Sequence, residues 1–137
     1  MRVSVVLDTN VLVSALYSKD GAPARVLSFV LSGYLVPCYD FRILEEYRDV
    51  LYRPKFCFPK HLVDDLLSWI ECNGVSVVAE PLDASFIDGS DKKFLEVAKT
   101  CFAILVTGNM KRFPQDSSVV AVKDFLEKIS SSPNAWH

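Results

Sequence analysis

The chain has 137 residues, of which 50% are hydrophobic and 23% are charged, as in a single compact domain. This composition excludes disordered, collagen-like and low-complexity chains, and no apolar run approaches the ~20 residues that cross a bilayer. Fifteen Lys and Arg residues against seventeen Asp and Glu residues give a net charge of −2, which excludes nucleic-acid binding through bulk positive charge. A nucleic acid held transiently by a local patch stays open.

The N-terminal segment and the cysteines both predict a soluble, cytoplasmic protein. The opening residues 1–8 reach a charge at Asp8, too early for the apolar core of a signal peptide. The cysteines nowhere form a C-x-x-C pair, which excludes the common zinc and thioredoxin-type motifs. Their neighbours are mostly apolar, so we expect buried free thiols in a reducing compartment at Cys38, Cys57, Cys72 and Cys101.

Apolar runs and turn signals divide the chain into alternating strands and helices. Residues 3–7 form a β-branched run, as in a strand buried on both faces of a parallel sheet. In chain order the expected elements are a strand at 3–7, a helix at 10–17, a helix ending before Gly33, a strand at 34–39, a helix at 42–51, a helix at 61–72, a strand at 75–79, a loop at 80–90, a helix at 91–102, a strand at 103–107, a strand at 118–122 and a helix at 123–130.

Strands that alternate with helices predict an α/β fold with a mainly parallel sheet. No repeat or linker divides the chain, so residues 1–137 are expected to form one domain with a short C-terminal tail from about residue 130. We expect this tail, which carries Trp136, to dock on the body of the protein or on a neighbouring chain.

Two polar residues follow strands at the sheet edge where parallel sheets bind ligands. Asp8 comes directly after the first strand, and Asn109 follows the strand at 103–107. Because the carboxyl ends of parallel strands lie at one edge, we expect Asp8 and Asn109 to stand at the same edge of the sheet.

Helical periodicity adds two carboxylates. In the helix at 42–51, Glu46 lies beside the apolar stripe, while the other acidic residues point to solvent. In the helix at 91–102, Asp91 projects into the apolar stripe, where a carboxylate is costly unless it is hydrogen-bonded or bound to a cation. The charged residues of this helix that are expected to face away are Lys92, Lys93, Glu96 and Lys99.

Each of these residues also has an ordinary structural interpretation. Asp8 is suited to cap the following helix, and Asp91 to complement a helix dipole. Glu46 fits a solvated helix flank, and Asn109 an ordinary turn after glycine. Taken together, several acidic groups at one sheet edge, with no paired cation in the motifs, favour a hard divalent metal ion.

Other catalytic classes lack their residues. A Ser-His-Asp or Cys-His nucleophile system needs a positioned histidine, and the chain has only His61 and His137. Neither a Gly-rich dinucleotide motif nor a P-loop is present. A phosphoacceptor receiver needs an acidic pair after the first strand, and a haloacid-dehalogenase-type phosphatase needs D-x-D, whereas this chain has Asp8-Thr9-Asn10. The receiver stays a third alternative.

Four motifs in order along nearly the whole chain resemble the PIN-domain nucleases. Residues 5–13 (VVLDTNVLV) resemble the opening of that family, and residues 43–47 (ILEEY) with 50–56 (VLYRPKF) resemble its second signature. The third and fourth signatures are similar to residues 91–96 (DKKFLE) and 104–109 (ILVTGN). The resemblance is strongest to the bacterial subgroup of toxin–antitoxin toxins (VapC-like ribonucleases).

This resemblance implies a three-layer α/β/α fold with about five strands and a metal-dependent endoribonuclease acting on single-stranded RNA. Asp8, Glu46 and Asp91 match the acidic positions that hold Mg²⁺ or Mn²⁺ in the family. Asn109 matches a fourth catalytic position at which many members carry aspartate, so one tightly held ion is expected rather than a pair.

The resemblance and an apolar content that is high for 137 residues both indicate partners. Lys111 and Arg112, just after the fourth motif, are candidates to bind RNA phosphates, although a solvated-surface interpretation stays open for both. An antitoxin protein and a homodimer or higher homo-oligomer are the expected protein partners, with no membrane. A PIN-fold module that binds protein or RNA with little turnover is the alternative, because Asn109 replaces a carboxylate.

Overall fold

The computed structural model describes residues 2–83 and 87–131. Its five strands form one parallel sheet in the order β3-β2-β1-β4-β5. The strands are β1 (Val3–Leu7), β2 (Leu35–Tyr39), β3 (Val75–Ser76), β4 (Ile104–Thr107) and β5 (Val119–Ala121). The predicted α/β class with a parallel sheet of five strands is therefore confirmed.

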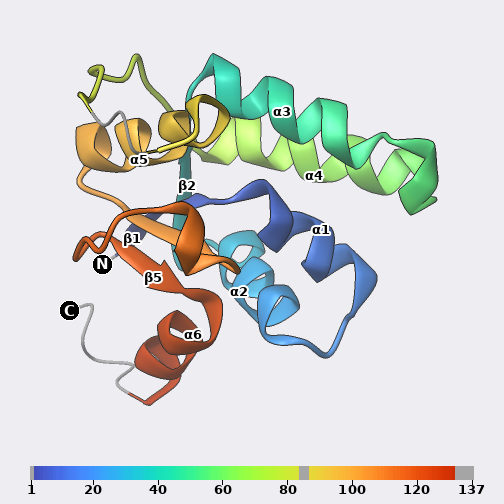
Figure 1. The fold of residues 1–137 in the computed structure, drawn as a ribbon. Helices are drawn as coiled ribbons and strands as arrows, with labels where there is room; N and C mark the ends of the chain where they lie inside the picture. The colour runs from blue at the N-terminus through green and yellow to red at the C-terminus, as the bar shows by residue number, and fades with distance from the viewer. Residues whose placement is uncertain (1, 84–86, 132–137) are drawn as a thin grey trace.

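Helices cover both faces of this sheet and complete the three layers (Figure 1). Helix α5 packs against β1, β2 and β4 on one face, and α2 packs against α1, α6 and β2 on the other. The helices are α1 (Thr9–Tyr17), α2 (Ala22–Leu31), α3 (Phe41–Leu51), α4 (Lys60–Asn73), α5 (Gly89–Cys101) and α6 (Val122–Ser131), with short 3-10 turns η1 (Pro54–Phe56) and η2 (Met110–Arg112). None of the helices in the described part of the chain is long and apolar enough to cross a bilayer.

Strand β1 lies at the centre of the sheet, which explains its continuous apolar sequence. It is paired with β2 on one side and with β4 on the other, and both of its faces are covered by helices. Val5 and Val6 are completely buried as a result. The strand ends at Leu7, so the polar residue that follows it emerges at the carboxyl edge.

The chain changes direction across the sheet between β1 and β4. After β1 it continues toward β2, whereas after β4 it continues toward β5 on the opposite side. Ligands of open parallel sheets bind at such a switch point. Asp8 and Thr107 lie there, and the backbone N–H of Asp8 donates to the carbonyl of Val106 at 3.0 Å.

The third strand is shorter than predicted, because it lies at the edge of the sheet. The pattern predicted a strand at 75–79, but β3 ends at Ser76. Val77 still donates one backbone hydrogen bond to Tyr39, and the chain then leaves β2, so that Val78 is 93% exposed. Val77 and Ala79 are only partly buried against the core, so the apolar run does not mark a fully buried strand.

The prediction of buried thiols was wrong for two of the four cysteines. All four are free, but only Cys38 is buried, and Cys101 is half-buried. Cys57 follows η1 in a left-handed conformation, and Cys72 lies in the last turn of α4; both are exposed. Apolar neighbours in sequence do not bury a residue on the outer side of a helix or in a connecting turn. Trp136 lies outside the described residues.

Candidate active site

Asp8 is completely buried at the end of β1. Its Oδ2 accepts hydrogen bonds from the hydroxyl of Thr107 at 2.7 Å and from Arg112 Nη1 at 2.8 Å. Its Oδ1 is buried and has no hydrogen-bond partner among the described residues. The carboxylate does not cap α1, although Asp8 precedes that helix. Burial raises the pKa of Asp8, and the bond from Thr107 and the charge of Arg112 oppose this rise.

Asp91 lies in the first turn of α5, and its carboxylate is turned toward Asp8. Helix α5 begins at Gly89 because Asp88 accepts hydrogen bonds from the backbone and hydroxyl of Ser90. The Asp91 carboxylate pairs with Arg112 through Nε at 3.1 Å and through Nη2. Arg112 thus bridges Asp8 and Asp91.

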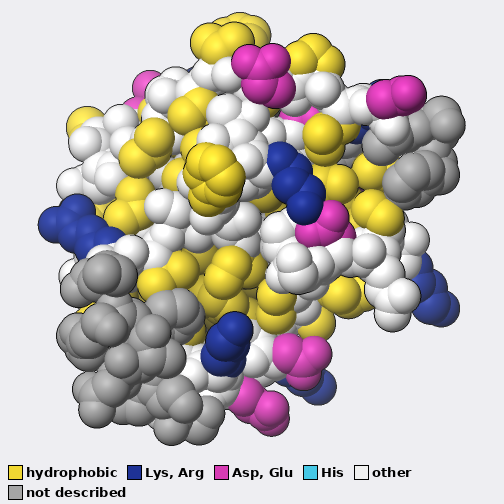
Figure 2. All heavy atoms as spheres, turned by 90° about the vertical axis from the view of Figure 1, so that its left-hand side faces the viewer, with side chains coloured by type: hydrophobic (Ala, Val, Ile, Leu, Met, Phe, Trp, Pro, Cys, Tyr) yellow, Lys and Arg dark blue, Asp and Glu magenta, His cyan; other side chains and the backbone are white. Residues whose placement is uncertain are grey.

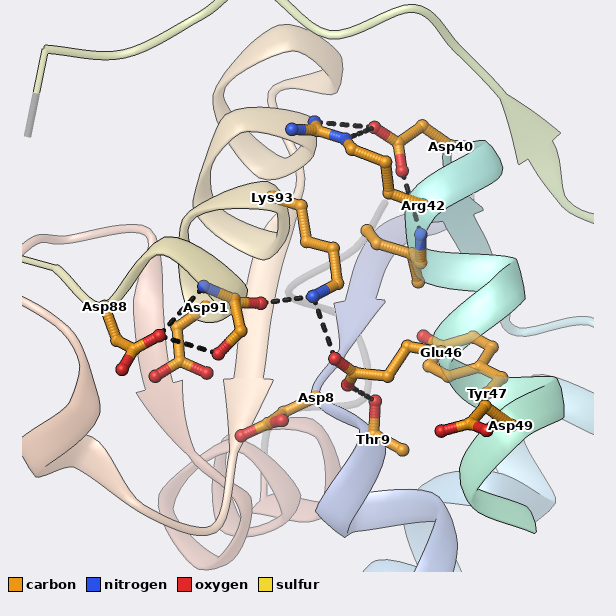
Figure 3. A network of polar contacts seen from close by, with 12 residues as sticks. Asp8, Thr9, Asp40, Arg42, Glu46, Tyr47, Asp49, Asp88, Asp91 and Lys93 are labelled. Carbon is orange, nitrogen blue, oxygen red and sulfur yellow. Dashed lines mark hydrogen bonds and ion pairs between the residues drawn. The ribbon is translucent and has the colours of Figure 1, made fainter. Parts of the chain in front are cut away.

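Glu46 reaches the same edge from α3, but it is held by other partners. Figure 3 shows its carboxylate turned toward Thr9 and Lys93. Thr9, the residue after Asp8, donates its hydroxyl hydrogen to Glu46 Oε2. Lys93 Nζ lies 2.8 Å from Glu46 Oε1 and also donates to the carbonyl oxygen of Ser90. Glu46 is therefore tied to α1 and α5 at once.

Asn109 forms the turn between β4 and η2. Its backbone N–H donates to the Thr107 hydroxyl at 3.0 Å, and that hydroxyl in turn donates to Asp8. Its side-chain oxygen accepts a hydrogen bond from the backbone N–H of Lys111 at 3.3 Å and so caps η2. The lysine side chain is exposed at the rim. Asn109 is thus linked to Asp8 through Thr107.

Two expectations about charge in α5 were wrong. Lys93 and Glu96 were expected to face solvent, but both are buried. The helical wheel assumed one covered face, whereas α3 also packs along α5. Burial opposes ionisation of Glu96, but hydrogen bonds from Leu82 N and Arg42 outweigh it and lower its pKa. Arg42 pairs with Asp40, the residue that caps α3 (Figure 3), and also with Glu96.

The motifs were also expected to lack a paired cation, and this was wrong. Arg112 neutralises Asp8 and Asp91, and Lys93 pairs with Glu46. From the sequence, Arg112 was expected to bind RNA phosphates and Lys93 to face solvent. Residue type and spacing cannot reveal ion pairs between different helices and strands, because these pairs join residues that are far apart in the chain.

Two further residues support the site and were missed. Thr107 orients Asp8, and its position as the last residue of a strand before Gly108 was an available signal. Tyr47 is completely buried and donates its hydroxyl hydrogen to the carbonyl oxygen of Leu7 at 2.5 Å. This bond joins α3 to the end of β1, and burial raises the pKa of Tyr47 well above its usual range. Its position on an apolar stripe gave no sign of this role.

The donor set fits a hard divalent ion at two carboxylates. Asp8 and Asp91 offer oxygen ligands, which Mg²⁺ and Mn²⁺ prefer, and the unpartnered Oδ1 of Asp8 is a buried acceptor that no described group satisfies. Within residues 2–83 and 87–131, no group of three carboxylate, histidine or cysteine side chains is close enough to hold a metal ion. The predicted set of three carboxylate ligands stays a prediction.

Comparisons with known proteins agree with the motifs. Residues 4–111 match the PIN domain family, a range that contains every candidate site residue except Arg112. An uncharacterized protein of Methanocaldococcus jannaschii is 29% identical over 129 residues, which is 90% of this chain and 77% of that protein. Neither match identifies the toxin subgroup. The family match covers most of the chain and agrees with its parallel sheet and acidic edge: the chain belongs to the PIN domain family.

Proposed function

We propose that this protein is a metal-dependent endoribonuclease that hydrolyses phosphodiester bonds of single-stranded RNA. The observation that carries the proposal is the buried carboxylate of Asp8, which meets Asp91 at the switch point of the sheet with one oxygen unpartnered among the described residues. PIN domains are generally nucleases, so membership of the family supports a phosphodiester substrate at a coarse level.

The charge distribution favours a substrate held locally. The net charge is −2, and Figure 2 shows Lys, Arg, Asp and Glu side chains scattered over one face rather than gathered into a basic stripe. Lys111 is exposed beside the candidate site, whereas Arg112 pairs with Asp8 and Asp91 within it; both are the cations proposed to contact RNA phosphates. A few phosphate contacts suit a short single-stranded segment better than a long duplex.

Asp8 and Asp91 are the residues proposed to hold Mg²⁺ or Mn²⁺, with Glu46 as a third ligand or as the residue that orients the attacking water. When bound, such an ion polarises the scissile phosphate and lowers the pKa of water. Thr9 and Lys93 fix both oxygens of Glu46, which suits a carboxylate that must hold one orientation. Asn109, at the edge of the site, is proposed to hydrogen-bond the water or the phosphate.

Water attack that breaks the bond between phosphorus and the 3′-oxygen leaves a 5′-phosphate and a 3′-hydroxyl. The test is incubation with end-labelled single-stranded RNA in Mg²⁺, in Mn²⁺ and in EDTA, followed by analysis of the product ends. We expect cleavage with either ion and none in EDTA. Cleavage that EDTA leaves unchanged would contradict the metal requirement.

A binding module with little turnover is the second candidate. The observation that favours it is the pairing of all three site carboxylates with cations of the same chain. In that case RNA would be bound with or without Mn²⁺, and no substrate would be cut at any concentration of the ion. The cleavage assay separates the two candidates.

A toxin role and protein partners form a further part of the proposal, and an apolar groove supports it. A cavity of about 240 Å³ lies between α1, α2 and α4. Its lining is almost entirely apolar and consists of Leu16, Leu27, Leu31, Leu62, Asp65, Leu66 and Trp69. Leu31 and Leu62 are exposed there, as expected of a surface that an apolar antitoxin segment or a second copy of this chain would cover.

The first test of the toxin role is whether a small open reading frame overlaps this gene upstream. Its product, co-expressed with this chain, should form a complex that Leu62→Glu weakens and that the exposed control Lys60→Glu leaves intact. Sedimentation of the isolated chain should give a homodimer or higher oligomer. A monomer at high concentration that binds no product of a neighbouring frame would contradict both expectations.

A further inference from the structure

A guanidinium lies between the two carboxylates that we propose as metal ligands. Arg112 Nη1 is 2.8 Å from Asp8 Oδ2, and Arg112 Nε is 3.1 Å from Asp91 Oδ2. Arg112 Nη2 pairs with the other oxygen of Asp91, so this contact is bidentate. The arginine side chain is 23% exposed, which places its charge within the site rather than in bulk water.

The positive charge at this position is permanent. Arginine stays protonated throughout the pH range in which proteins fold, and hydrogen bonding to Asp91 raises the pKa of Arg112 further. Without a cation between them, the carboxylates of Asp8 and Asp91 would repel each other. Arg112 therefore balances the pair of carboxylates when no ion is bound.

The guanidinium leaves this pair incompletely satisfied. Asp8 Oδ2 already accepts a hydrogen bond from Thr107 in addition to that from Arg112, whereas Oδ1 is buried without a partner among the described residues. An unpartnered buried acceptor is costly and uncommon. It indicates that the carboxylate has a ligand other than Arg112.

Arg112 is placed where it can leave without disturbing the sheet. It is the last residue of η2, after β4 has ended, and its guanidinium lies 5.5 Å from the centre of the Phe113 ring. Within the described part of the chain, its polar side-chain contacts are those with Asp8 and Asp91. Rotation about side-chain bonds would move the charge to the rim beside Lys111.

We infer that Arg112 is an internal counter-ion that competes with the divalent metal ion for Asp8 and Asp91. In the metal-free protein it keeps the two carboxylates together, and binding of the ion displaces its guanidinium toward the RNA-facing rim. The inference rests on the proposed function, because it takes Asp8 and Asp91 as metal ligands. Arg112 thereby positions the two carboxylates and raises the concentration of metal ion that is needed to occupy them.

The test is Mn²⁺ binding by the purified protein without RNA, measured by calorimetry. Arg112→Gln should bind Mn²⁺ at least about tenfold more tightly than the parent, because a positive charge in contact with both ligands is gone. Lys111→Gln is the matched control, since it removes the same charge from an exposed neighbour in the same turn. Its affinity should stay close to that of the parent.

The outcomes separate this inference from the proposed function. If the parent binds Mn²⁺ and Arg112→Gln binds it no more tightly than Lys111→Gln, competition is overturned while the metal site stands. If neither the parent nor Arg112→Gln binds Mn²⁺ or Mg²⁺ at millimolar concentration, the competition and the proposed metal site are both overturned. Binding by Arg112→Gln alone supports the competition in its strongest form.

A second measurement uses the unaltered side chain and does not depend on the folding of a glutamine variant. The NMR signal of the Arg112 Nε–H, assigned by comparison with Arg112→Lys, should shift as Mg²⁺ is added, with the same midpoint as backbone signals near Asp8. A signal that stays in place while Mg²⁺ saturates the site would overturn the displacement.

Discussion

At the scale of single residues, the burial of Asp8 determines the electrostatics of the candidate site. A carboxylate without access to water is costly in its charged form, and burial accordingly raises the pKa of Asp8. Hydrogen bonds from Thr107 and Arg112 to Oδ2 offset part of this cost. The other oxygen, Oδ1, has no partner in the described part of the chain. Such a group lowers stability, which is consistent with the metal-binding role that we propose for it.

Asp8→Asn should abolish RNA cleavage and leave the fold intact. Because the folded-state pKa of Asp8 is raised, its charge costs stability progressively as the pH rises above 3.8, the ordinary pKa of an aspartate. The variant should therefore melt at the same temperature as the parent or higher at neutral pH, and the difference should shrink below pH 4. Thermal melts and an RNA cleavage assay in saturating Mg²⁺ measure both effects. The exposed control Asp49→Asn should keep its activity, and undiminished cleavage by Asp8→Asn would refute the site.

Asn109→Asp tests whether this residue belongs to the metal site or only to the turn. Aspartate caps a helix as well as asparagine does, so the turn itself should be preserved. An added charge beside Asp8 and Asp91 should lower the melting temperature without metal and tighten divalent binding. The expected result is a larger rise in melting temperature on adding Mn²⁺ than the parent shows. Equal rises in the parent, in Asn109→Asp and in the distant control Asn73→Asp would place Asn109 outside the site.

At the scale of secondary-structure elements, backbone approach and ion pairs hold the strand ends in place. Helix α4 ends at Gly74, where a Cβ would lie 2.5 Å from the carbonyl oxygens of both Ile70 and Pro37. This close approach lets the chain turn directly from α4 into β3 beside β2. On the other side of the sheet, Asp116 connects the segment before β5 to α5.

Gly74→Ala should destabilise the protein, because two backbone oxygens cannot both move away from the added carbon. We expect a loss of about 1–3 kcal/mol in the free energy of unfolding, as for other overpacked sites. Urea unfolding measures this loss. Gly89→Ala is the matched control, since nothing lies within 4 Å of its added Cβ, and it should leave stability unchanged or slightly higher. Equal stability of the two variants would show that the turn can relax.

The pairing of Asp116 with Lys99 should make stability depend on pH in the acid range. The hydrogen bond from Lys99 at 2.7 Å, with those from Ser118, lowers the pKa of Asp116 to about 2. A carboxylate with a depressed pKa contributes stability above the ordinary aspartate pKa of 3.8, and this stability is lost as the pH falls from there toward 2. Asp116→Asn should therefore be about 1 kcal/mol less stable at pH 6, after allowing for solvent screening. In urea titrations the gap should close near pH 2, and a constant gap would contradict this assignment.

At the scale of the whole molecule, net charge limits how the proposed RNA substrate could be bound. The net charge is −2, and the visible face in Figure 2 shows charges of both signs without a basic stripe. The RNA binding that we propose would therefore depend on the few cations at the carboxyl edge rather than on the field of the whole protein.

RNA affinity should consequently depend only weakly on salt. If about three phosphates are contacted, the logarithm of the affinity should fall with the logarithm of the salt concentration with a slope of about −2. Fluorescence anisotropy with Asp8→Asn, which should not cleave, measures the slope without loss of substrate. A slope steeper than about −4 would indicate an extended basic surface and would contradict a local site.

The sequence by itself determined what depends on neighbouring residues along the chain. Alternating apolar runs predicted the α/β class and the parallel sheet, because hydrophobic periodicity reports which side of an element is buried. Because Asp8 directly follows β1 and Asn109 follows β4, the sequence predicted that both residues lie at the carboxyl edge of the sheet. The four motifs predicted the family, which the match over residues 4–111 confirmed.

Only the tertiary structure decided which charges meet. Arg112 reaches Asp8 across a separation of 104 residues, because β4 lies directly beside β1 and η2 follows β4. Lys93 is buried because α3 packs along α5, a contact that the periodicity of α5 alone does not contain. A sequence pattern predicts which face of a helix or strand is buried. The partner of a charged residue depends instead on which helices and strands the fold places side by side.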